Sequence, residues 1–163
     1  MHIPHFLRKF LSIFFFSRQR RHAFVEGWTG NKIVIVEEDG TEKELSPWTH
    51  IAGLHLSIDG SGNVLRLHKP FRLSNCRVCL ERGSSVDIGS SPYDIGGHFW
   101  VHNGGSLRIG KNFSCGAHLE IIGFDEPGLT VQIGDDCMFS HDILVRASDG
   151  HVIFNPSTRQ VLN

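Results

Sequence analysis

The chain has 163 residues, with 16 Lys and Arg against 17 Asp and Glu, and a formal net charge of −1. Because 40% of the residues are hydrophobic and 20% are charged, the composition excludes both a wholly disordered chain and a polytopic membrane protein. The 18 glycines are spread from Gly27 to Gly150. This spread indicates many tight turns, and therefore a β-rich fold rather than a linker or a collagen.

Charge is distributed unevenly along the chain. Five basic residues precede the first acidic residue, Glu26, which leaves 11 basic and 17 acidic residues in the remainder, a difference of −6. An acidic body is poorly suited to bind a phosphate backbone, so we expect no nucleic-acid partner.

Residues 1–25 form a basic, amphipathic segment, in which a helix is predicted over 3–16. Its apolar residues recur three and four positions apart (Ile3, Phe6, Leu7, Phe10, Leu11 and Phe14). The apolar face either lies in a membrane interface, with residues 3–21 making peripheral contact, or packs on the protein's own domain or a sister subunit. The apolar run at 11–16 is too short to cross a bilayer and lacks a cleavage site. We therefore expect a cytoplasmic protein, at the inner face of the membrane if the helix contacts lipid.

The four cysteines are expected to be reduced thiols, because no secretory signal precedes them. Cys76 and Cys79 form a CxxC pair without the second pair of a zinc ribbon. We therefore expect them to pack in strands as small hydrophobic residues and not to bind a metal.

Residues 26–50 are expected to form an N-terminal hairpin. The sequence KIVIV at 32–36 predicts a strand, Glu38-Asp39-Gly40 contains an Asp-Gly turn, and residues 41–45 return as the second strand.

From residue 51 onward, short alternating runs of apolar and polar residues repeat. The phrase recurs as GSSVDIG at 83–89, GSLRIG at 105–110 and GLTVQIG at 128–134, with a weaker copy at 62–67. The Ile-Gly pairs that begin at Ile88, Ile109 and Ile133 are 21 and 24 residues apart, a period typical of a solenoid. Stacked coils would place Ile on Ile in a continuous column, and the Gly after each Ile would allow a sharp corner. A β-sandwich is the alternative, but its strands would not share one phrase.

The phrases IGKNFS at 109–114 and IGDDCMFS at 133–140 resemble the hexapeptide repeat of left-handed parallel β-helix acyltransferases. The stretch 131–163 is similar to the segment that leads into the catalytic loop of acetyltransferases for capsular polysaccharide and sialic-acid polymers. The resemblance implies an all-β, left-handed parallel β-helix over 51–163 and a homotrimer with sites between subunits. It also implies acetyl-CoA as donor and a sugar or capsular polysaccharide as acceptor. Chains of the family continue with further coils beyond the position of Asn163, so the C-terminal coils of this domain are expected to be missing.

In that family a His shortly after this coil is the general base, and the matching residue is His151. An imidazole titrates near pH 6.5, so it can accept the proton of a sugar hydroxyl and release it again. The hydroxyl oxygen would then attack the thioester carbonyl of acetyl-CoA. Asp149 would accept a hydrogen bond from the imidazole and set its tautomer, although Asp149-Gly150 also reads as a plain turn.

Further residues are candidates for contact with the substrate. His141 lies beside two polar neighbours and is the second choice for the base, while Arg146 would meet an anionic sugar or a phosphate of CoA. More distant relatives, the maltose-type acetyltransferases, carry an Asn in the coil before, and His118 is the candidate for that role. For each of these residues the alternative interpretation is an ordinary side chain exposed to solvent. The full set is Ser140, His141, Asp142, Arg146 and His118.

Two other functions stay open on the sequence. One is a non-catalytic β-solenoid fragment or scaffold. The other is a zinc-dependent hydratase of the carbonic anhydrase type, with imidazoles stacked on successive coils. His98, His118 and His141 lie 10, 9 and 8 residues after the preceding Ile of the repeat, so they do not fall in one column. We therefore expect no metal ion.

Overall fold

The computed structural model describes residues 30–151 and 153–161, so the predicted helix at 3–16 lies outside the described part. Within that part every regular element is a β-strand, and none is a helix long and apolar enough to cross a membrane. The strands are β1 (Lys32–Val36), β2 (Glu42–Leu45), β3 (Leu54–Asp59), β4 (Val64–His68), β5 (Arg72–Glu81), β6 (Ser85–Ile88), β7 (Asp94–Val101), β8 (Ser106–Ile109), β9 (Ser114–Cys115), β10 (Leu119–Ile122), β11 (Thr130–Ile133), β12 (Met138–Phe139) and β13 (Ile143–Arg146).

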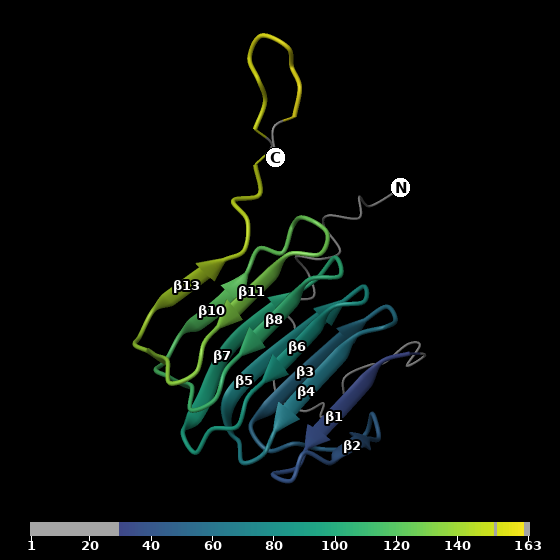
Figure 1. Ribbon diagram of the computed structural model, residues 1–163, viewed down its shortest axis with the longest axis vertical. Coiled ribbons are helices and arrows are strands. Elements are labelled where there is room, and N and C mark those ends of the chain that lie inside the picture. Colours follow the sequence, from purple (N-terminus) through teal and green to yellow (C-terminus); the bar gives the residue numbers. More distant parts are fainter. Residues whose placement is uncertain (1–29, 152, 162–163) are drawn as a thin grey trace, which may run out of the picture.

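From β2 onward, successive strands lie in different sheets, so that the chain winds into a solenoid (Figure 1). A 6-stranded sheet has the order β11-β8-β6-β4-β1-β2, a 5-stranded sheet has the order β13-β10-β7-β5-β3, and β12 pairs with β9 in a third. All neighbours run parallel except β1 and β2, which form the predicted hairpin. The predicted all-β parallel β-helix is confirmed, and the β-sandwich alternative is wrong.

The core is a set of vertical columns that run through the stacked coils. Ile88 lies beside Ile109, which lies beside Ile133, and their exposed fractions are 0%, 3% and 8%. The predicted stacking of Ile on Ile is confirmed. Each such side chain contributes roughly 1.5–3 kcal/mol by leaving water, and it does so only because a neighbouring coil covers it.

A buried polar ladder holds one corner of the first coils. The side-chain oxygen of Asn31 accepts hydrogen bonds from the backbone N–H (2.8 Å) and the side-chain amide (3.0 Å) of Asn63. Asn63 in turn accepts a bond from the backbone N–H of Ser84 at 2.9 Å. The ladder supplies buried backbone donors with partners just before strands β4 and β6 begin.

The glycine after each Ile has a different role from the one predicted. Gly89, Gly110 and Gly134 are not among the glycines with positive φ, so backbone freedom at a corner does not explain them. A Cβ on Gly89 would lie 2.7 Å from the carbonyl carbon of Gly110, and one on Gly110 would lie 2.5 Å from that of Gly134. The coils approach too closely here for a side chain, so packing between coils requires glycine at 89 and 110.

Candidate functional site

His151 lies just beyond β13, where the chain leaves the solenoid and projects away from it (Figure 1). Its side chain is exposed, and Gly150 before it has a φ of +69°. The backbone N–H of His151 donates to Oδ1 of Asp149 at 3.0 Å. Asp149 therefore shapes the turn that presents His151. Its predicted hydrogen bond with the imidazole stays a prediction.

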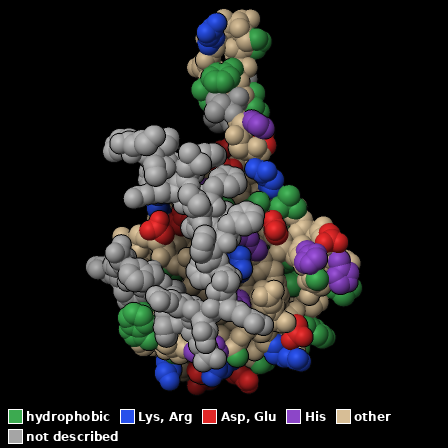
Figure 2. Space-filling model, turned by 180° about the vertical axis from the view of Figure 1, so that it is seen from behind, with side chains coloured by type: hydrophobic (Ala, Val, Ile, Leu, Met, Phe, Trp, Pro, Cys, Tyr) green, Lys and Arg blue, Asp and Glu red, His purple; other side chains and the backbone are tan. Residues whose placement is uncertain are grey.

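A second group of predicted site residues meets at one corner of the solenoid, where the turn before β13 stacks on the turn before β10. Nδ1 of His118 lies 2.8 Å from Oδ1 of Asp142, and the backbone N–H of Ala117 donates to Nδ1 of His141 at 3.1 Å. Because that Nδ1 accepts a hydrogen bond, the neutral ring of His141 carries its proton on Nε2. Ser140 is exposed in the same turn. Figure 2 shows histidine and acidic side chains together on one flank of the solenoid.

The residue types at this corner suit the shape of its backbone. His118 and Asp142 have φ values of 64° and 57°, a left-handed conformation in which His, Asn and Asp are enriched among non-glycine residues. Gly116 is also required, since a Cβ there would lie 2.8 Å from Nδ1 of His141.

The predicted site residues thus fall into two groups at opposite ends of β13. The four-residue strand separates Asp142 from Arg146 by about 13 Å, at roughly 3.3 Å per residue. Arg146, at the end of β13, belongs with His151: a Cβ placed on Gly150 would lie 3.7 Å from a guanidinium nitrogen of Arg146. His118, Ser140, His141 and Asp142 form the other group.

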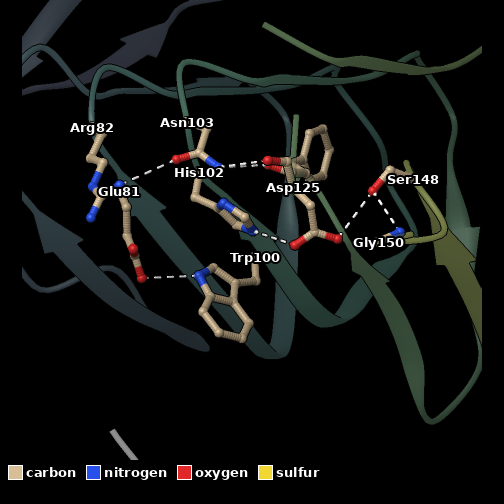
Figure 3. A network of polar contacts seen from close by, with 9 residues as sticks. Glu81, Arg82, Trp100, His102, Asn103, Asp125, Ser148 and Gly150 are labelled. Carbon is tan, nitrogen blue, oxygen red and sulfur yellow. Dashed lines mark hydrogen bonds and ion pairs between the residues drawn. The ribbon is translucent and has the colours of Figure 1, made fainter. Parts of the chain in front are cut away.

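Sequence reasoning missed a polar network that reaches the His151 turn from the preceding coils (Figure 3). Oδ2 of Asp125 accepts a hydrogen bond from Oγ of Ser148 at 3.1 Å, and Oγ of Ser148 accepts one from the N–H of Gly150 at 3.3 Å. Oδ1 of Asp125 lies 3.9 Å from Nε2 of His102. The signal available in the sequence was the lengthening of the repeat from 21 to 24 residues in this region.

The outer face of β7 carries a row of rings. The imidazole of His98 stacks on Trp100 with centroids 6.5 Å apart, and Trp100 tilts against His102 at 5.6 Å. The indole N–H of Trp100 donates to Glu81 at 3.0 Å. Burial lowers the pKa of His98, and the positive charge of Arg77 lowers it further. Within 30–151 and 153–161, His, Cys, Asp and Glu side chains form no group of three that could hold a metal ion.

The fold places the chain in the class of parallel β-helix proteins with short, stacked coils. No protein-family model matches it. In sequence, it is 35% identical over 69 residues to a polysialic acid O-acetyltransferase of Escherichia coli O1:K1 / APEC, a segment that covers 42% of this chain and 22% of the relative.

In structure, the chain is similar to the polySia-specific acetyltransferase NeuO, with a TM-score of 0.65 and 23% identity. The match covers 84% of this chain and 53% of that one, so the chain spans about half the length of the solved structure. Both similar proteins are acetyltransferases, and the predicted resemblance to polysaccharide and sialic-acid polymer acetyltransferases is confirmed.

Proposed function

We propose that the protein is an O-acetyltransferase that moves an acetyl group from acetyl-CoA to a hydroxyl of a sugar or polysaccharide. The observation that carries this proposal is the joint likeness of sequence and fold to proteins named as acetyltransferases of polysialic acid. Polysialic acid is accordingly the first acceptor to test.

In this proposal His151 is the general base. Its ring takes the proton of the acceptor hydroxyl while the hydroxyl oxygen attacks the carbonyl carbon of the thioester. The C–S bond then breaks, and the CoA thiolate receives the proton from the imidazolium. The exposed position of His151 supports this role, since a general base must be accessible to the acceptor hydroxyl.

Arg146 is the candidate to bind an anionic group of either substrate. Its side chain is exposed at the end of β13, and its guanidinium lies next to the turn that carries His151. A guanidinium binds phosphate or carboxylate through two parallel hydrogen bonds, which suits both CoA and an acidic sugar. We also propose a homotrimeric, cytoplasmic enzyme whose residues 3–21 contact the inner face of the membrane.

Release of CoA thiol tests the function. The purified protein is given acetyl-CoA with polysialic acid, with a neutral polysaccharide, or with no acceptor, and free thiol and acetylated product are measured. We expect acceptor-dependent release and O-acetylated product. A protein that transfers acetyl to no hydroxyl acceptor would overturn the proposal and favour a scaffold.

His151→Ala tests the base. Acetyl transfer is expected to fall by roughly 10²–10⁴-fold, the usual contribution of such a group. His50→Ala is the matched control, because His50 is also exposed and lies before β3, in the first coils. Activity of His151→Ala above about one hundredth of the wild-type value would assign the base to another residue.

A further inference from the structure

Beyond β13 the chain stops following the strand register of the coils. The backbone N–H of Ala147 still bonds to the carbonyl of Ile122 at 2.9 Å, which continues the ladder between β13 and β10. Beyond β13 the chain then projects from the solenoid (Figure 1). The direction in which the turn leaves therefore depends on contacts made by residues 148–151.

Asp125 makes such a contact from the preceding coil. Its carboxylate accepts the hydroxyl of Ser148 at 3.1 Å, and a Cβ on Gly150 would lie 3.3 Å from the same oxygen. The same hydroxyl of Ser148 accepts the N–H of Gly150, so Asp125 is linked directly to Ser148 and indirectly to Gly150. The next residue is His151.

Asp125 is itself held by the coil before it. The side-chain amide of Asn103 donates to the carbonyls of Phe124 and Asp125, at 3.2 and 3.1 Å. Phe124 is fully buried, so the backbone beside Asp125 is anchored in the core. His102, whose side chain is 17% exposed, flanks the second carboxylate oxygen. Figure 3 shows these contacts as one chain that runs from coil to coil toward Ser148 and Gly150.

We infer that Asp125 is a positioning residue: it ties Ser148 to the solenoid and thereby orients the turn that presents His151. The effect of this tether on turnover rests on the proposed function, in which His151 is the base. A base must lie within hydrogen-bond reach of the proton it removes, and a displacement of about 1 Å costs as much as 10²-fold in rate. The tether therefore affects turnover without Asp125 touching the substrate.

Amide exchange tests the tether without any assumption about activity. Asp125→Ala is expected to speed hydrogen exchange in peptides that contain residues 148–151 by roughly 3- to 10-fold, the effect of losing one ordinary hydrogen bond. Glu126→Ala, which removes the adjacent exposed carboxylate, is the matched control and should leave exchange unchanged. Ser148→Ala removes the same contact and also the acceptor of the Gly150 N–H, so it should speed exchange at least as much as Asp125→Ala, and the double variant should add little to Ser148→Ala.

Kinetics test the consequence. Asp125→Ala is expected to lower kcat for acetyl transfer by about 10- to 100-fold, with KM for acetyl-CoA within about 2-fold and an unchanged unfolding midpoint. Asp125→Asn keeps an oxygen for Ser148 and should recover most of kcat.

If exchange and kcat in Asp125→Ala equal those of Glu126→Ala, the inference is overturned. If Asp125→Ala exchanges faster but the wild-type protein transfers no acetyl, the tether is upheld and the proposed function is refuted. If the protein transfers acetyl but Asp125→Ala shows unchanged exchange and turnover, the proposed function is upheld and the tether is refuted.

Discussion

The two ends of the solenoid differ in how the edge of the 6-stranded sheet is covered. At the N-terminal end, β2 pairs antiparallel with the outer edge of β1, and its exposed charges form ion pairs: Glu42 with Arg66 at 3.1 Å and Glu44 with Lys32 at 3.9 Å. At the other end, β11 and β13 each have a partner on one side only among the described residues. Met138 and Leu144 are 82% and 55% exposed there.

This difference shows that position in the stack decides how much a side chain contributes to stability. Ile121 in β10 is fully buried, whereas Val145, its neighbour in register on β13, is only half-buried although both point inward. In a solenoid each coil contacts only its neighbours, so a terminal coil loses one of its two interfaces. Charged or antiparallel strands such as β2 protect an edge from further pairing.

The largest expected contrast is between two isoleucines of the same sheet. Ile121→Ala should lower the free energy of unfolding by about 2–5 kcal/mol, since it leaves a cavity between covered coils. Ile143→Ala on the half-buried edge strand should cost only about 1 kcal/mol, because its site already faces water on one side. Urea denaturation measures both. Equal losses would show that the last coil is covered in solution.

The second contrast uses the glycines that stack between coils. Gly110→Ala should destabilise by about 1–3 kcal/mol, because the new Cβ would meet the backbone of Gly134 at 2.5 Å. Gly134→Ala is the matched control, since nothing lies within 4 Å of the position that its Cβ would take, and it should be neutral or stabilising by less than about 1 kcal/mol. Thermal unfolding of the two variants measures the difference. A neutral Gly110→Ala would mean that the coils separate easily.

The smallest effect concerns acid stability and compares His98 in the central strand β7 with His55 on the edge strand β3. Burial lowers the pKa of His98 below its ordinary value near 6.5, so below that pH the unfolded chain binds more protons than the folded one. Stability should therefore fall as pH drops from about 6.5 toward the folded-state pKa.

His98→Gln should lessen this loss by less than about 1 kcal/mol, because the half-buried ring is partly screened by solvent. His55→Gln is the matched control in the same row of the sheet, where His55 is exposed beside Arg77. Unfolding midpoints at pH 7.5 and 5.5 measure the effect. An equal drop in midpoint between these two pH values in His98→Gln and in the wild type would contradict it.

Much of the fold followed from the repeat. The strands β6, β8 and β11 lie within the repeated phrases at 83–89, 105–110 and 128–134, and β1 coincides with the predicted strand at 32–36. The likeness to acetyltransferases was also readable from the Ile-Gly phrases. Period and alternation are local properties of a solenoid, so residues one coil apart in sequence are neighbours in space.

The sequence by itself therefore determined the coil, its period and the column of isoleucines. Only the tertiary structure decided which polar residues meet between coils: His118 with Asp142, and Asp125 with Ser148. Those pairs depend on the length and shape of the loop in each coil. A loop longer or shorter by one residue would shift a side chain along the solenoid and turn it in another direction. For the same reason the role of Gly110 became visible only when the next coil was in place.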